Sequence, residues 1–318
     1  MKAVWVWILM AVSFGLQAQG YPAKSIRLIV PLAPGGNQDI VARAVAEEVS
    51  KVLGQQIVVE NRPGSSAIVG TQSVKASAPD GYTLLSVSNT FARVPGIVKA
   101  AGYDAAADFT GVSLVSRIPM VLVVNPGNPA RTLQDLVALA KDKPGSISYG
   151  TSGVASTGHV AGELLSRQSG IKLLHVPYKG NSQAIVDVLG GQITMMFDQV
   201  STAVGHIRSG KLRALGVTTK ARSALLPDVP TLHDTGAPGF DDVTWNGIVA
   251  PAGTPREIVA QLHAAVARAL GNDEFRKRFL ERGIDMVASA SPAEFSAYVK
   301  SEAEDFVKLA REANIRAE

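Results

Sequence analysis

The sequence predicts an α/β protein built from two lobes, and three observations predict it. Short β-branched runs alternate with helical patterns at the start of the chain, the same alternation begins again at residues 120–197, and the chain ends in three helical patterns. Parallel strands need crossover connections, which are usually helices, so each alternating unit implies a sheet covered by helices. The final helices need a surface to cover, and we expect them to return to the first lobe.

The first unit has the order strand, helix, strand, helix, strand. The first helix carries apolar residues at helical spacing until Gly54 stops it, and the second follows the Gly/Ser-rich turn 63–66 and ends before Pro79. Strands of this unit are expected at 26–30, 57–60 and 83–87.

The second unit repeats this architecture. Thr132 and Asp135 form an approximate capping box for its first helix. Its strands are expected at 120–124, 146–149, 173–176 and 193–197, and its helices at 132–140, 159–167 and 183–189. Two further strands follow at 212–217 and 247–250, and capping boxes at 254–257 and 291–294 open two of the three final helices.

The first twenty residues have the pattern of a secretory signal. Lys2 is their only charge, residues 3–16 are apolar, and Ala18-Gln19-Gly20 has small residues where signal peptidase cleaves. As a helix, such a block spans about 21 Å at ~1.5 Å per residue, which is short of the ~30 Å hydrocarbon layer. We therefore expect cleavage near Gly20 rather than a membrane anchor, and a soluble protein outside the cytoplasm.

Composition excludes several function classes. The 318 residues include 31 Lys and Arg against 27 Asp and Glu, with no basic run, which argues against a nucleic-acid partner. There is no cysteine, so disulfides and thiolate chemistry are excluded. The five histidines lack metal-ligand spacing, and the P-loop-like stretch 205–211 is followed by Leu212 instead of the required hydroxyl. We expect no metal and no cofactor.

A glycine-rich turn joins the first strand to the first helix. Pro34-Gly35-Gly36-Asn37 lets the backbone approach a ligand closely, and the first amides of a helix have no partner within it. These amides and the helix dipole favour an anion site. The alternative is a tight turn in which Asn37 caps the helix. Asp39 either favours the helix dipole or faces the cleft, where it would select an ammonium group.

A second junction of the same kind lies at 149–159. Ser156 or Thr157 suits the helix N-cap, which leaves Thr151, Ser152 and the amides near Gly153 free to donate hydrogen bonds. One such junction in each lobe suits a small molecule with a carboxylate at each end, or with a carboxylate and another polar group.

A serine hydrolase that pairs His159 with Ser152 or Ser156 is a further alternative. No Gly-x-Ser-x-Gly sequence supports it.

Segments along the whole chain carry a family resemblance, among them "YPAKSIRLIVPLAPGGNQDIVAR", "VVENRPG", "APDGYTLL", "HVPYKG", "VDVLGGQITMMFD" and "APAGTP". In these segments the chain resembles the Bug family, the extracytoplasmic receptors of tripartite tricarboxylate transporters. The resemblance implies a two-lobed fold like that of type II periplasmic binding proteins, with mixed sheets, two connecting strands and a ligand cleft. We expect a signal peptide at 1–20, lobe 1 at 21–122 and 240–318, and lobe 2 at 123–239.

The resemblance also implies a function and a site. The function is that of a non-catalytic, monomeric periplasmic receptor, which delivers a dicarboxylate, an aromatic acid or an amino acid to membrane permease subunits. A sensory protein that signals to a membrane kinase remains the alternative. The unusual stretch 88–96 adds Phe91 and Arg93 as possible ligand contacts. The expected site residues are Pro34, Gly35, Gly36, Asn37, Asp39, Ser88, Asn89, Thr151, Ser152, Gly153, Ser156, Thr157, His159 and Asp198.

Overall fold

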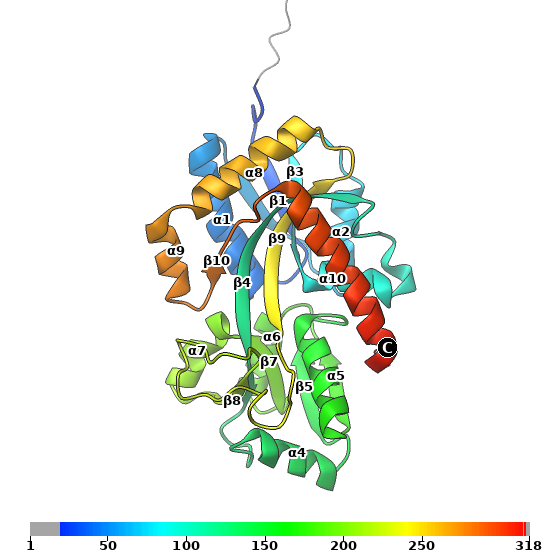
Figure 1. Cartoon of the computed structure of the whole chain (residues 1–318), viewed down its shortest axis with the longest axis vertical. Helices are drawn as coiled ribbons and strands as arrows, with labels where there is room; N and C mark the ends of the chain where they lie inside the picture. Colours follow the sequence, from blue (N-terminus) through cyan, green and yellow to red (C-terminus); the bar gives the residue numbers. More distant parts are fainter. Residues whose placement is uncertain (1–19, 314, 316–318) are drawn as a thin grey trace, which may run out of the picture.

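Two long antiparallel strands, β4 (Phe109–Val124) and β9 (Val243–Pro251), lie side by side through the middle of the molecule (Figure 1). The computed structural model describes residues 20–313 and 315, so all of the predicted signal peptide except Gly20 lies outside the described residues. β4 pairs with β9 as far as Pro119 and with other strands from Met120 onward. This change of partners divides the molecule into two parts, which we call lobe 1 and lobe 2.

Lobe 1 contains both ends of the described chain. Its sheet has the order β2-β1-β3-β9-β4, with β10 paired to β4, and β1 is parallel to both β2 and β3. Its strands besides β4 and β9 are β1 (Ile26–Val30), β2 (Ile57–Asn61), β3 (Thr83–Ser88) and β10 (Asp285–Met286). Its helices are α1 (Asn37–Leu53), α2 (Ile68–Lys75), α3 (Asn89–Arg93), η1 (Val94–Gly96), η2 (Lys99–Ala101), α8 (Arg256–Leu270), α9 (Asp273–Leu280) and α10 (Pro292–Ala313).

The sequence of α1 explains its length and its position. Val41, Val45 and Val49 lie on one face at helical spacing, are buried, and belong to a core that also includes residues of α8. Gly54 ends the helix with φ of 67°, a left-handed conformation that glycine adopts without steric cost, and its N–H donates to the Ser50 carbonyl. The predicted first strand and helix are confirmed.

Lobe 2 is the second α/β unit. The C-terminal end of β4 pairs with β7 and β8, and β5 lies parallel between β6 and β7. Its strands besides β4 are β5 (Ile147–Thr151), β6 (Leu173–Pro177), β7 (Met195–Gln199) and β8 (Arg213–Val217). Its helices are α4 (Leu133–Asp142), α5 (Thr157–Ser169), α6 (Asn181–Leu189) and α7 (Val200–Arg208). The predicted α/β class with mixed sheets is confirmed.

The predicted capping box at Thr132 is confirmed, and the one at Thr254 is wrong. The predicted box of Thr132 and Asp135 opens α4, with both reciprocal hydrogen bonds present. The box predicted at Thr254 is wrong, because the Thr254 hydroxyl donates to the Pro251 carbonyl and α8 begins after Pro255 without a side-chain cap. A hydroxyl that satisfies the preceding turn is not available to the helix.

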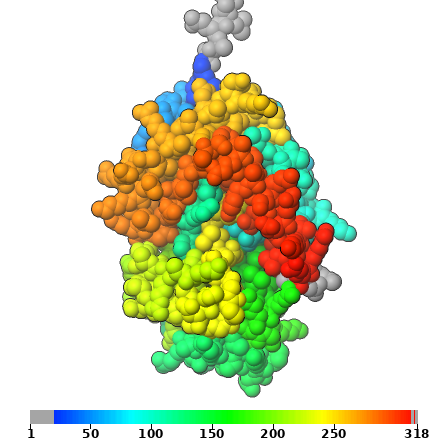
Figure 2. Space-filling view, viewed as in Figure 1, coloured from blue at the N-terminus to red at the C-terminus, as the bar shows by residue number. Residues whose placement is uncertain are grey.

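The strand predicted at 120–124 is only the last part of β4. Its first eleven residues belong to lobe 1 and include Gly111 and Pro119, which are not typical of a strand interior. The helix α10 also links the lobes, since it packs on lobe 1 and contacts α5. In Figure 2 the red surface of α10 descends over lobe 1 until it meets the green surface of lobe 2. Among the described residues, no helix is long and apolar enough to cross a membrane.

Candidate functional site

A small cavity lies where the two lobes meet. Its volume, counted as the space that the centre of a water molecule can occupy, is about 30 Å³. Among its lining residues there is no lysine or arginine, and Asp39 is the single charged one. The lining residues are Leu32, Ala33, Gly36, Asn37, Gln38, Asp39, Ser88, Thr90, Ser152, Thr157, Gly158, Gly180, Asn181, Gln199, Thr244 and Asn246.

The N-terminus of α1 forms one wall of the cavity. Gly36 is the N-cap and no side chain caps the helix, so the alternative in which Asn37 caps it is wrong. The Asn37 side chain instead donates to Ser201 Oγ in lobe 2 at 2.9 Å and accepts from Asn246 Nδ2 at 3.0 Å. The first-turn amides of α1 therefore remain open to an anion in the cavity.

Asp39 is paired within lobe 1. Its carboxylate accepts from the Gly35 N–H at 3.0 Å and from Asn61 at 2.9 Å, and Arg43 lies 3.0 Å away as its ion-pair partner. Burial acts to raise the pKa of Asp39, but the hydrogen bonds from Arg43, Gly35 and Asn61 outweigh it, so the net pKa is lowered. The interpretation of Asp39 as a free anion that selects an ammonium group loses its basis, because the charge is already balanced.

The N-terminus of α5 forms the facing wall in lobe 2. Ser156, one of the two predicted N-cap candidates, is the N-cap, and its hydroxyl accepts from the His159 N–H. Thr151 is not free to donate to a ligand, since it exchanges hydrogen bonds with Gly153 and lies 2.7 Å from His175 Nε2. Ser152, Thr157 and Gly158 are the residues of this junction that line the cavity.

His159 and His175 support this loop from behind. Their rings lie 4.2 Å apart between centroids, and the Ala155 N–H donates to His159 Nδ1 at 3.1 Å. Burial lowers the pKa of His159 to about 4; burial, followed by the neighbouring His159, lowers that of His175 to about 3. Both rings are therefore neutral at pH 7. His159 Nδ1 serves the backbone of Ala155 rather than a serine hydroxyl.

A third junction between a strand and a helix also lines the cavity, and it was not predicted from the sequence. Gly180 and Asn181 follow β6 and line the cavity. Asp198, expected to face the cleft, lies behind Asn181 with no exposed surface and accepts from Asn181 Nδ2 and Thr202 Oγ1. Burial raises the pKa of Asp198 to about 6 despite these bonds. The signal was present in "YKGN", which repeats the pattern of a glycine followed by a helix-opening asparagine.

The lobes contact each other directly around the cavity. The Ala33 N–H donates to the Lys179 carbonyl at 3.1 Å, and Ser182 Oγ donates to the Pro34 carbonyl at 3.0 Å. On the other side, the Val154 N–H donates to Ser66 Oγ at 2.9 Å. This contact requires a glycine at position 153, where φ is 121° and a Cβ atom would lie 2.7 Å from Ser66 Oγ. These bonds join the two lobes directly beside the cavity.

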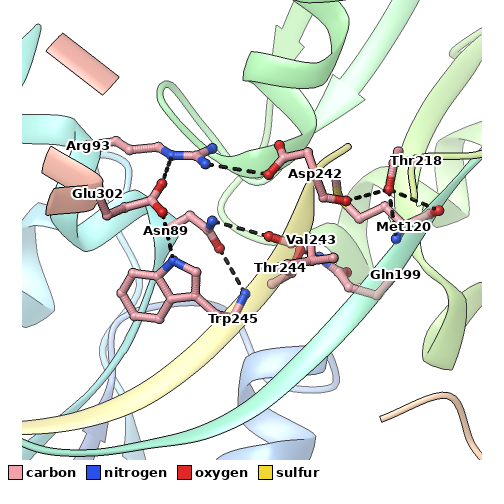
Figure 3. A network of polar contacts seen from close by, with 10 residues as sticks. All are labelled: Asn89, Arg93, Met120, Gln199, Thr218, Asp242, Val243, Thr244, Trp245 and Glu302. Atoms are coloured by element: carbon pink, nitrogen blue, oxygen red, sulfur yellow. Dashed lines mark hydrogen bonds and ion pairs between the residues drawn. The ribbon is translucent and has the colours of Figure 1, made fainter. Parts of the chain in front are cut away.

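A buried polar network lies where β9 enters lobe 1 (Figure 3). Asn89, expected in the site, donates to the Val243 carbonyl and accepts from the Trp245 N–H. Arg93 contacts Glu302 of α10 at 2.6 Å and Asp242 at 3.6 Å, and Trp245 Nε1 donates to Glu302.

Phe91 and Arg93, which the sequence adds as candidate ligand contacts, both lie outside the cavity lining. Phe91 packs against Tyr103 and Phe109, and neither Phe91 nor Arg93 lines the cavity.

The predicted site residues fall into two groups. Those that line the cavity are Gly36, Asn37, Asp39, Ser88, Ser152 and Thr157. Those that are not among its lining residues are Pro34, Gly35, Asn89, Thr151, Gly153, Ser156, His159 and Asp198. The second group shapes the loops, because polar groups that are buried beside a cavity first satisfy one another.

Known proteins share this fold. The family model "Tripartite tricarboxylate transporter family receptor" matches residues 41–314. The periplasmic binding protein BugD is 33% identical with a TM-score of 0.89, and the match covers 94% of this chain and 100% of BugD. Rpa4515 of R. palustris, solved with adipate, is 32% identical with a TM-score of 0.89, over 94% of this chain and 100% of that chain.

MatC from Rhodopseudomonas palustris, solved with bound malate, is 31% identical with a TM-score of 0.86, over 91% of this chain and 99% of that chain. These structures have the two-lobed periplasmic-binding-protein fold that the sequence predicts. The resemblance to the Bug proteins is confirmed, and the chain belongs to the receptor family of tripartite tricarboxylate transporters.

Proposed function

We propose that this protein is a periplasmic receptor that closes around a small organic acid and delivers it to a tripartite transporter in the membrane. The observation that carries the proposal is the convergence of two helix N-termini, those of α1 and α5, on one cavity between the lobes. Each N-terminus offers unpaired amides and a partial positive charge to a carboxylate.

The absence of lysine and arginine from the cavity lining is compatible with this role. Hydrogen bonds from amides to a charged group contribute about 1.5–3 kcal/mol each, so a few of them supply micromolar binding without an ion pair. Two structural relatives bind adipate and malate, both of which carry two carboxylates. The proposed ligand class for this chain is therefore a small carboxylate, with Gly36, Asn37, Ser152, Thr157 and Ser88 in contact with it.

Lobe closure is the proposed mechanism. A ligand touches both lobes only when they are shut, so its binding energy stabilises the closed population. We propose that the lobes move as bodies about β4 and β9. The boundaries expected from the sequence, 122/123 and 239/240, lie within a few residues of the change in strand pairing after Pro119 and of the start of β9. The bonds from Ser182 to Pro34 and from Asn37 to Ser201 then act as latches of the closed form.

The remaining parts of the proposal follow from the family and from the signal pattern. The protein acts after export and removal of residues 1–20, as a monomer, without a cofactor and without catalysis. Pairing of His159 with the backbone of Ala155 argues against the hydrolase alternative. Delivery to permease subunits, rather than to a membrane kinase, is supported by the description of the family.

A thermal-shift panel tests the proposal, with dicarboxylates, aromatic acids and amino acids as ligands. A ligand at ~100 times its Kd stabilises the folded state by about 2.7 kcal/mol, which raises the Tm of a chain of this size by roughly 5 °C. We expect such a rise with at least one class of acid and none with the matching amides, which lack the carboxylate. If no acid raises the Tm, the proposed function is wrong.

A further inference from the structure

Every side-chain amide that lines the cavity uses its nitrogen as a hydrogen-bond donor to the protein itself. Five asparagine and glutamine side chains line it, and the nitrogen of each donates to a protein acceptor: Asn37 to Ser201, Gln38 to Ser86, Asn181 to Asp198 and Gln199, Gln199 to Thr244, and Asn246 to Asn37 and Ser116. Asn181 and Asn246 each donate to two protein acceptors, and Asn37 and Gln199 each donate to one, so these amides have few N–H groups left to offer an anion.

The carbonyl oxygens of Asn37 and Gln199 accept from Asn246 and Asn181, but the other three are in the opposite state. Gln38 Oε1 and Asn246 Oδ1 are buried and accept no hydrogen bond from the described residues, and none donates to Asn181 Oδ1 either. Gln38 and Asn246 are 5% and 0% exposed, so bulk solvent does not compensate them. A buried acceptor without a donor is costly, which makes these oxygens groups that favour a ligand with donors.

The orientation of two of these amides is fixed by their partners. Gln38 Nε2 lies 2.8 Å from the Ser86 carbonyl, which can only accept, so the nitrogen must face Ser86 and the oxygen the other way. Asn181 Nδ2 lies 3.0 Å from the Asp198 carboxylate, which fixes it in the same manner. One fixed acceptor therefore comes from each lobe, since Gln38 is on α1 and Asn181 is on α6.

The neighbours of Gln38 place the lobe 1 acceptors together. Ser86 and Ser88 lie on the same face of β3, because side chains alternate along a strand, and Asn246 of β9 is directly opposite Ser88. Asn246 in turn donates to Asn37, which precedes Gln38 in the chain. The acceptors of lobe 1 thus share one patch beside the N-terminus of α1, where the proposed carboxylate lies.

We infer that the ligand is an organic acid that also carries a hydrogen-bond donor, either a hydroxyl or an ammonium group, which the carbonyl oxygens of Gln38 and Asn181 accept between the lobes. This inference rests on the proposed function and narrows its ligand class. The backbone amides of α1 and α5 hold the carboxylate, and the carbonyl oxygens of the side-chain amides accept a hydrogen bond from the donor. An acid without the donor leaves the buried carbonyl oxygen of Gln38 unpaired and binds more weakly.

Matched trios of ligands test the inference by isothermal titration calorimetry. The trios are succinate, malate and aspartate; glutarate, 2-hydroxyglutarate and glutamate; and phenylpropionate, phenyllactate and phenylalanine. In the trio that binds best, we expect the hydroxy or amino acid to bind at least ten-fold more tightly than the unsubstituted acid. If the hydroxy acid of that trio binds more tightly than the amino acid, the donor is a hydroxyl; if the amino acid binds more tightly, the donor is an ammonium group.

Variants connect the preference to the residue. Q38M keeps the volume of the side chain and removes the acceptor, and we expect it to reduce the preference to about two-fold or less. S182A is the matched control, since it removes a contact between the lobes without touching an amide carbonyl. It weakens all three acids of a trio by the same factor and leaves the preference intact.

The outcomes separate the two proposals. If the unsubstituted acid binds as tightly as its substituted partners to the unmodified protein, the inference is wrong while the proposed function stands. If Q38M is folded and retains the full preference, Gln38 does not read the donor and the inference is wrong in the same way. If no acid of any trio binds, the proposed function fails and the inference with it.

Discussion

Replacing Arg93 by methionine tests the energetic role of the network between the lobes. The Arg93 side chain is 7% exposed and lies between Glu302 at 2.6 Å and Asp242 at 3.6 Å. Burial acts to lower the pKa of Arg93, but these two carboxylates raise it overall, so the guanidinium is charged. Burial raises the pKa of Asp242 to about 6 even with Arg93 present. Methionine leaves two facing carboxylates without a counter-charge, which costs about 3–5 kcal/mol in buried pairs.

The assay is urea unfolding at pH 8 and at pH 5. At pH 8 we expect Arg93→Met to lower the free energy of unfolding by about 3–5 kcal/mol. At pH 5 the loss is smaller, because Asp242, whose folded pKa is raised, binds a proton and no longer opposes Glu302. Arg311→Met on the exposed face of α10 is the control, with an expected change within about 0.5 kcal/mol. A loss at pH 8 equal to that of the control refutes the reasoning.

Three further predictions concern residues beside the cavity. Folding raises the pKa of Asp198 from 3.8 to about 6, so its contribution to stability is present below pH 4 and is lost as the pH rises through 6. In urea unfolding, the free energy of unfolding of Asp198→Asn should therefore rise by roughly 2–3 kcal/mol relative to that of the unmodified protein between pH 4 and pH 7. A difference in unfolding free energy that stays constant over this range contradicts the prediction. Ser182→Ala removes the hydrogen bond to the Pro34 carbonyl, which contributes about 0.5–1.5 kcal/mol to the closed form. Small-angle scattering without ligand should then detect more open molecules, and every ligand should bind about 2–10-fold more weakly. An unchanged Kd contradicts this prediction. Asp39→Asn breaks the ion pair with Arg43, so it should lower the free energy of unfolding by about 1–3 kcal/mol. It should also weaken the binding of dicarboxylates and of amino acids by the same factor. A selective loss of amino-acid binding would restore the interpretation that Asp39 selects an ammonium group.

Local sequence patterns predicted the elements of this fold well. The helix α1 was readable because Val41, Val45 and Val49 repeat at helical spacing and Gly54 ends the helix. The length of β4 was not, because Gly111 and Pro119 interrupt the strand pattern, and the pairing with β9 that compensates for them is formed by residues far away in the sequence.

The junction residues that line the cavity were only partly predictable. The glycine-rich turns before α1 and α5 predict an anion site from local chemistry, since unpaired amides follow from any helix start. Which side chains face the cavity depends on competition for hydrogen bonds. Asp39 and Asp198 were both expected there as charged groups. Asp39 lines the cavity, but its charge is paired with Arg43, whereas Asp198 is buried behind Asn181 and Thr202. Asn181 itself was not predicted, although Gly180-Asn181 repeats the local pattern of Gly36-Asn37, a glycine followed by a helix-opening asparagine.

Replacement of Thr157, the first residue of α5, by proline tests the central claim most directly. Proline fits the first position of a helix and removes one backbone N–H, and Ser156, which precedes it, already has the extended conformation that proline requires. Thr157→Ala removes the side chain and keeps the N–H. If helix amides hold the carboxylate, titration calorimetry with the tightest-binding acid should give a Kd at least ten-fold weaker for Thr157→Pro than for Thr157→Ala. Equal Kd values for two folded variants would contradict the account.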